Sequence, residues 1–150
     1  MNNFIETLKA TGMVNIKHFD ENMNLVKELD VPNLVVTTGK NYIAAKMVAT
    51  TNSPASMTHM AIGTGSTTPA SSNTALVTQT GIVGLSGSTV SSNAITYTAT
   101  FPAGTGTGAI KEAGIFNASS SGTMLCRTTF AEVNKGAGDT IAITWVVTVA

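Results

Sequence analysis

The sequence predicts an all-β domain, a β-sandwich or jelly roll, with one short α-helix near residues 38–50. Three observations predict this class. Apolar and polar residues alternate in about eight short segments, which is the period of a half-buried strand. Clusters of Gly, Asn, Ser and Pro separate these segments about every 8 to 12 residues. Only the segment near residues 38–50 carries apolar residues at helical spacing.

The first predicted elements form a β-hairpin. Val14 and Ile16 alternate with polar residues over residues 13–19, and the alternation resumes over residues 25–30. The intervening residues 20–24 have the Asx-rich composition of a turn. We therefore expect two antiparallel strands joined by a loop of about five residues.

A short strand at residues 34–36 leads into the predicted helix at residues 38–50. Four of its larger residues recur at helical spacing, namely Tyr42, Ile43, Lys46 and Met47. Several alanines favour the helix further. Thr37 or Thr38 is placed to cap its first turn.

The rest of the chain is expected to be strands and turns. Further strands are predicted at residues 57–62, 81–85, 90–101, 109–117, 123–130 and 140–149. The glycines of residues 63–65 and 104–108 lack the Lys and the following helix of a phosphate-binding P-loop. We expect them to supply positive-φ positions in turns instead.

We interpret the chain as an N-terminal arm, residues 1–11, followed by one sandwich domain, residues 12–150. Candidate interface residues are the large apolar side chains of the arm and one aromatic residue of the last strand, namely Phe4, Ile5, Leu8 and Trp145. Trp145 is equally consistent with a core position.

Composition narrows the range of partners. Charged residues make up 11% of the chain, against about 25% in typical domains, and the net charge is zero. Nucleic-acid binding and polybasic membrane binding both need a basic surface, so neither is expected. A weakly charged chain is prone to self-association, and we expect a homo-oligomer.

Charge is also unevenly distributed along the chain. The first 46 residues carry ten of the sixteen charged groups, and residues 47–110 carry none. The start of the chain lacks the pattern of a signal peptide, and no apolar run is long enough to span a membrane. We expect synthesis in the cytoplasm, with export only as part of a larger particle.

No catalytic, cofactor-binding or metal-binding residues are predicted. His18 and His59 are far apart, and Cys126 is the single cysteine, so the spacing of a metal site is missing. Cys126 fits a buried, unreactive thiol. An enzyme such as a glycan hydrolase would have to use scattered carboxylates, for instance Glu112 or Glu132.

Four strings of residues, taken in order, resemble small virion proteins of tailed bacteriophages. They span residues 33–40, 59–76, 111–130 and 141–145. The resemblance covers residues 12–150 and includes capsid decoration (cement) proteins and tail-associated or fibre-associated modules. It implies a structural β-sandwich, commonly trimeric, on the surface of a virion.

Two functions follow from this resemblance. The leading hypothesis is a cement protein at the capsid surface, where the arm and the charged hairpin of residues 13–30 bind the major capsid protein. The alternative is a tail or head fibre-associated module that adsorbs to host glycans through the loops at residues 63–73 and 103–108. Other virion proteins are the expected partners in both cases.

Overall fold

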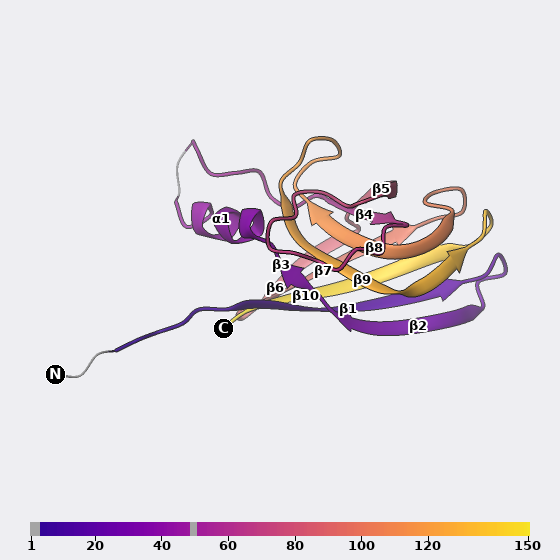
Figure 1. Ribbon diagram of the computed structural model, residues 1–150, viewed down its shortest axis with the longest axis horizontal. Helices are drawn as coiled ribbons and strands as arrows, with labels where there is room; N and C mark the ends of the chain where they lie inside the picture. Colours follow the sequence, from indigo (N-terminus) through magenta and orange to yellow (C-terminus); the bar gives the residue numbers. More distant parts are fainter. Residues whose placement is uncertain (1–3, 49–50) are drawn as a thin grey trace.

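The computed structural model describes residues 4–48 and 51–150, which form ten strands and one helix (Figure 1). Their bounds, in chain order, are β1 Ala10–Phe19, β2 Leu25–Pro32, β3 Leu34–Val35, α1 Thr37–Ala45, β4 His59–Gly63, β5 Gln79–Gly84, β6 Gly87–Ser91, β7 Ala94–Phe101, β8 Gly108–Phe116, β9 Met124–Lys135 and β10 Thr140–Val149.

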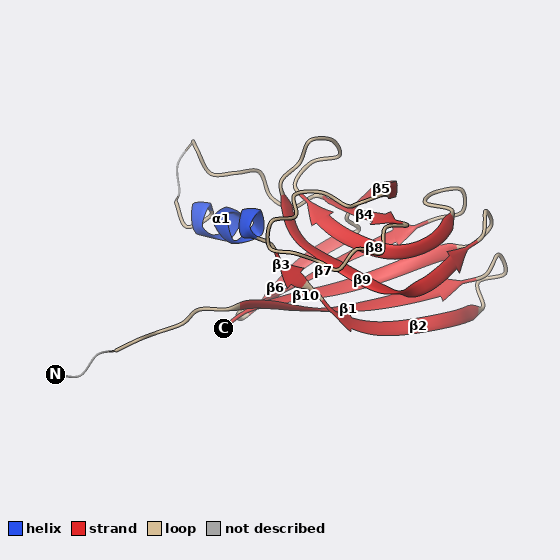
Figure 2. Cartoon of the chain, viewed as in Figure 1, coloured by secondary structure: helices blue, strands red, loops and turns tan. Residues whose placement is uncertain are grey.

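The strands form two five-stranded antiparallel sheets. The first sheet has the order β2-β1-β10-β7-β6, and the second has the order β3-β9-β8-β4-β5. Figure 2 shows the single helix at one end of this β structure. The predicted all-β class with one short helix is confirmed, and the two sheets pack as a sandwich.

The main core lies between the two sheets. In the first sheet, Val14 of β1 lies opposite Trp145 of β10, which in turn lies opposite Tyr97 of β7. Alternate residues of β10 point into this core, as the period of a strand requires. The largest fully buried apolar side chains include Trp145, Phe101, Ile16, Met60, Ile62, Ile110, Ile115, Ile141 and Ile143. Burial of each such side chain stabilises the fold by about 1.5–3 kcal/mol.

A second, smaller core lies on the opposite face of the second sheet. It contains Val36, Ala61, Leu76, Phe116 and Met124. Leu76 belongs to the long connection between β4 and β5, so this connection lies against the sheet. We call residues 64–78 the covering segment.

The helix is shorter than the sequence predicts. It begins at Thr37 and ends at Ala45, and positions 49–50 of the predicted helix lie outside the described residues. The expected threonine cap is wrong, because Val36 occupies the N-cap position without a side-chain hydrogen bond. Thr38 Oγ1 instead donates to the carbonyl oxygen of Met124, at 2.9 Å. The hydroxyl therefore ties the helix to β9.

Two strand predictions need correction. The alternating stretch at residues 90–101 is a hairpin of β6 and β7, with Ser92 at φ 55° in the turn. Strand β9 continues to Lys135, well beyond the predicted end at Phe130. The last residues of β9 include Glu132 and Asn134, and polar residues of this kind are typical of a loop. The predicted β1–β2 hairpin is confirmed.

The base of the N-terminal arm meets the C-terminal residue at one end of the sandwich. The backbone N–H of Lys9 donates to the carbonyl of Ala150, and the N–H of Ala150 donates to the carbonyl of Lys9. Residues 4–9 form no helix or strand and extend away from the body (Figure 1). Within the described residues, no helix is long and apolar enough to cross a membrane.

Candidate functional site

A buried ion pair holds the covering segment on the second sheet. Glu112 of β8 and Arg127 of β9 are both fully buried, with 2.8 Å between Arg127 Nη2 and Glu112 Oε2. Arg127 Nε donates a second hydrogen bond to the same oxygen, at 3.1 Å. The third guanidinium nitrogen, Nη1, donates to Asn73 Oδ1 of the covering segment, at 3.1 Å.

The same carboxylate also binds the backbone of the covering segment. Glu112 Oε1 accepts from the N–H groups of Gly65 and Thr78, at 3.1 Å and 2.7 Å. Glu112 Oε2 accepts from the N–H of Val77, at 3.0 Å. One side chain therefore satisfies three backbone donors at both ends of the segment, which a buried segment requires.

The pKa of Glu112 reflects these contacts. Burial alone would raise the pKa of this carboxyl, but the hydrogen bonds from Thr78, Val77 and Arg127 outweigh burial and lower it below its ordinary value. The group is therefore a stable carboxylate that is fully occupied by the fold. It does not have the raised pKa of a general acid, so nothing in the site favours the glycan hydrolase hypothesis for Glu112.

Two glycines make room for this carboxylate. A Cβ on Gly65 would lie 2.5 Å from Glu112 Oε1, and one on Gly63 would lie 2.8 Å from the same oxygen. Neither glycine has a positive φ, so the prediction that these two glycines supply positive-φ positions in a turn was wrong. The positive-φ prediction is confirmed for Gly104, Gly106 and Gly108.

The two lateral edges of the sandwich differ in charge. Edge strand β2 carries Lys27, Glu28 and Asp30 and ends at Pro32, which are features that discourage pairing with another strand. The opposite edge is formed by β5 and β6, which are joined by residues 85–86 and carry no charged residue. This uncharged edge therefore comes from the charge-free interval of the sequence.

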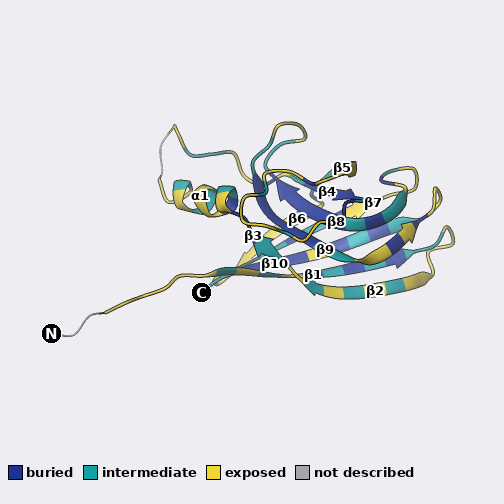
Figure 3. Ribbon diagram, viewed as in Figure 1, coloured by how far each residue is buried: buried dark blue, intermediate teal, exposed yellow. Residues whose placement is uncertain are grey.

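The N-terminal arm exposes three large apolar side chains. Phe4 is 95% exposed, Ile5 is 89% exposed and Leu8 is 70% exposed. Figure 3 shows the arm as exposed along its described length. Met47 and Val48, which follow α1, are also exposed. One end of the protein therefore carries an unusual concentration of uncovered apolar surface.

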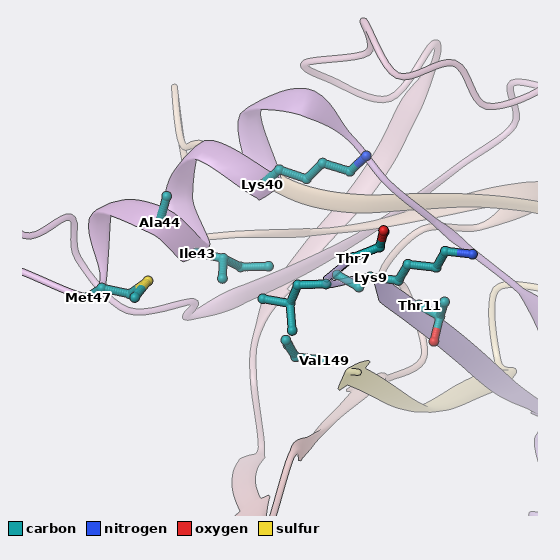
Figure 4. Close-up of a pocket in the computed structure, with 10 residues that line it drawn as sticks. Thr7, Lys9, Thr11, Lys40, Ile43, Ala44, Met47 and Val149 are labelled. Carbon is teal, nitrogen blue, oxygen red and sulfur yellow. The ribbon is translucent and has the colours of Figure 1, made fainter. Parts of the chain in front are cut away.

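A groove of about 560 Å³ lies between the base of the arm and α1 (Figure 4). Its apolar lining comes from Leu8, Ala10, Ile43, Ala44, Met47 and Val149. Lys9 and Lys40 also line it, and the close-up shows their amino groups at the ends of extended side chains.

The structure does not gather the four candidate interface residues in one place. Phe4, Ile5 and Leu8 lie together on the arm, whereas Trp145 is fully buried between the sheets. Trp145 occupies the core position that the sequence also allowed.

The other chemically reactive side chains have structural partners. His18 Nε2 lies 2.8 Å from Asp139 Oδ2, and His59 Nδ1 lies 2.8 Å from Thr58 Oγ1. Cys126 is buried as predicted, and burial raises the pKa of its thiol. Among the described residues, no three His, Cys, Asp or Glu side chains cluster to hold a metal ion.

The main feature that sequence reasoning missed is the pairing of Glu112 with Arg127. A signal was present, because these are opposite charges on two neighbouring predicted strands that are otherwise mostly apolar. In the register, Arg127 lies opposite Gly114, one diagonal step from Glu112. What the sequence did not indicate is the covering segment, which completes the burial of both charges.

The family model described as phage tail-collar fibre protein, N-terminal, matches residues 31–149. No significant match was found among curated proteins or among solved structures. The match confirms the expected virion protein of a tailed phage and supports the fibre alternative. It gives no support to the leading hypothesis of a capsid decoration (cement) protein. The chain belongs to the phage tail-collar fibre protein N-terminal family and is a structural component of a tailed-phage virion.

Proposed function

We propose that this domain is the module that seats a tail fibre against another protein of the virion, by protein–protein contact and without catalysis. The family description refers to the N-terminal part of a tail-collar fibre protein, which supports a place within the fibre. The observation that carries the proposal is the uncharged edge formed by β5 and β6.

An edge strand presents unpaired backbone N–H and C=O groups to its surroundings. Natural proteins usually protect such an edge with charges or proline, as β2 does here. The exposed residues of β6 are Ser, Thr and Val, including Val90, which is 71% exposed. This edge can accept a partner strand or a flat partner surface without the cost of desolvating charged groups.

Two matched substitutions test this proposal. Val90 lies on edge strand β6, and Val26 lies on edge strand β2 at the other side of the same sheet. Both side chains are more than half exposed, so lysine at either position is tolerated by the fold. Phage carrying V90K should assemble particles with few fibres, whereas V26K particles should carry the normal number.

The readout is the copy number of this chain in purified particles, measured by quantitative mass spectrometry and by electron microscopy of the tails. Circular dichroism of each purified variant shows that the fold is retained. Normal fibre numbers in V90K particles would refute the seating role of this edge.

Host adsorption is the second candidate function, and one observation favours it. The two loops proposed to bind glycan lie together, because a Cβ on Gly108 would lie 3.7 Å from Thr64 Cγ2. A separate hollow of about 290 Å³ has hydroxyl and amide side chains in its lining, including Thr74, Gln79 and Ser119–Ser121. Hydroxyl and amide groups of this kind form hydrogen bonds with sugars.

A competition assay separates the two candidates. Purified wild-type chain is added to host cells before the phage. If the chain binds cells and reduces infection, and Gln79→Ala abolishes both effects, the adsorption role holds. If the chain leaves adsorption unchanged while V90K reduces fibre number, the seating role alone holds.

A further inference from the structure

We propose that the N-terminal arm of one copy docks in the groove between the arm base and α1 of a second copy of this chain. Arm residues 4–6 are the ligand, and the groove lined by Leu8, Ile43, Ala44, Met47 and Val149 is the receptor. The proposal concerns contact between copies, and it does not depend on which virion protein receives the fibre.

The arm has apolar side chains that its own chain leaves uncovered. Phe4 and Ile5 are 95% and 89% exposed, close to the values of an unfolded chain. Covering these two side chains in an apolar groove removes their apolar surface from water and so favours association. Exposed large apolar groups that are contiguous in this way mark a contact surface.

The groove has the size and the lining of a receptor for such side chains. Its volume of about 560 Å³ lies within the range of about 300–1,000 Å³ that is usual for ligand pockets. Ile43, Ala44 and Met47 supply one wall from α1 and the turn after it, and Val149 supplies the end of β10. These side chains are placed around a common space in Figure 4.

The arm is poorly placed to fill the groove of its own chain. Thr7, Leu8 and Lys9 form a wall of the groove, and Lys9 is held by its backbone bonds to Ala150. Phe4 would have to reverse direction within two or three residues to reach the groove. The intervening sequence Ile5-Glu6-Thr7 lacks the Gly, Pro, Asn or Asp that favours a tight turn.

Charge complementarity supports a second copy as the partner. Glu6 is exposed in the middle of the arm, while Lys9 and Lys40 line the groove. In the described part of the chain, the ion pairs involve His18–Asp139, Lys111–Glu132 and Arg127–Glu112. Glu6, Lys9 and Lys40 take part in none of these pairs. An incoming arm therefore brings an anion to a groove that presents cations.

The geometry also suits exchange among identical copies. Arm and groove lie at the same end of the molecule, so each copy gives one arm and receives one (Figure 1). Exchange of an identical element between protomers closes a symmetric assembly at low cost. Sedimentation equilibrium gives the number of copies in the closed assembly.

The first experiment is sedimentation equilibrium of the full chain and its variants. The double variant F4S/I5S and the groove variant A44R should weaken association about tenfold to a hundredfold. V90S, which removes a similarly exposed apolar side chain at the β6 edge, is the matched control and should associate like wild type. A monomeric wild type, or association that V90S weakens and F4S/I5S does not, would overturn the proposal.

Charge reversal gives a test that is independent of folding defects. E6K and K40E should each weaken association, and the double variant E6K/K40E should restore it. Restoration cannot come from a damaged fold. Failure of the double variant to recover association, with both single variants impaired, would contradict the paired charges.

Cross-linking then shows whether the arm docks in the same chain or in a neighbour. The one natural cysteine, Cys126, is buried, so cysteines introduced at Ile5 and Ala44 are the reactive ones. Mixed I5C and A44C chains should form a disulfide-linked heterodimer on mild oxidation. The double variant I5C/A44C should form covalent oligomers. A monomeric disulfide in the double variant would place the arm in its own groove and refute exchange.

Discussion

Arg127 donates two hydrogen bonds, from Nε and Nη2, to Oε2 of Glu112 across the β8–β9 hairpin, and neither side chain is exposed to solvent. The pair lies on the outer face of the second sheet, where the covering segment shields it. The carboxylate also accepts the N–H groups of Gly65, Val77 and Thr78. The pair therefore organises a long, uncharged connection that has no strand or helix of its own.

Replacing Glu112 with Gln should destabilise the protein by about 3–5 kcal/mol, because Arg127 is then left as a buried charge without a counter-ion. Urea unfolding followed by circular dichroism measures the loss. Glu132→Gln is the control, because its ion pair with Lys111 is longer, at 3.6 Å, and partly exposed. That control should change stability by no more than about 1 kcal/mol.

A double variant checks the reason for this loss. E112L/R127M removes both charges, so it should be more stable than E112Q alone. It still lacks the acceptor for three backbone donors of the covering segment. Hydrogen exchange at Gly65, Val77 and Thr78 should therefore stay faster than in wild type. Equal stability of E112Q and E112L/R127M would show that the unpaired arginine is not the cause.

Acid should loosen the covering segment before it unfolds the sandwich. The folded-state pKa of Glu112 is lowered, because hydrogen bonds from Thr78, Val77 and Arg127 outweigh the effect of burial. Its unfolded pKa is about 4.3. The contribution of Glu112 to the free energy of unfolding is complete above the unfolded-state pKa. It is lost as the pH falls through the lower folded-state pKa.

Urea midpoints measured from neutral pH down to about pH 3 test this sign. Wild type should lose stability over the acid range, and E112Q should show a flatter acid limb. Asp139 contributes in the same direction, because hydrogen bonds from His18 and Gly136 lower its pKa. D139N therefore separates the two contributions. If the stability of E112Q falls as steeply with decreasing pH as that of wild type, Glu112 is not the source of the acid sensitivity.

Gly39→Ala should destabilise the protein, although alanine is the better helix former. Gly39 is buried in α1, and a Cβ there would collide with the backbone carbonyl oxygen of Leu125 on β9. Alanine in place of glycine usually gains about 1 kcal/mol in a helix. Here the collision should reverse the sign and cost about 1–3 kcal/mol. Thermal unfolding measures the change, with exposed Asn41→Ala in the same helix as a control that should be stabilising or neutral.

Sequence patterns predict local features of this fold better than long-range ones. The alternation over residues 140–149 predicts β10 with its observed bounds, because the period of a strand is a local property. The β6–β7 hairpin escapes the same reasoning, because Ser92 and Asn93 form a tight turn between strands that are themselves rich in Ser and Thr. Helix α1 is predicted, but its ends depend on how it docks against β9.

The candidate site depends on contacts that no local pattern contains. The exposed arm with Phe4 and Ile5 is visible in the sequence, whereas the groove beside it requires α1 and the end of β10 to meet. The burial of Glu112 likewise requires residues far along the chain to fold over it. The charge-free interval is visible in the sequence, but only the sheet order shows that it supplies the β5–β6 edge of the sandwich.

Trp145, the single tryptophan, should behave as a buried reporter that does not respond to association. Its side chain is fully buried, and its indole Nε1 has no hydrogen-bond partner among the residues that the structure describes. We expect blue-shifted fluorescence in the folded protein, with acrylamide quenching that is the same in the dilute and the concentrated, self-associated protein. The exchange proposed above buries Phe4 and Ile5, so it leaves Trp145 unchanged. Quenching that falls with concentration would instead place Trp145 at an interface. W145F should lower the free energy of unfolding by less than the roughly 3–5 kcal/mol expected for W145A. Phenylalanine fills part of the site and removes the unpaired indole donor.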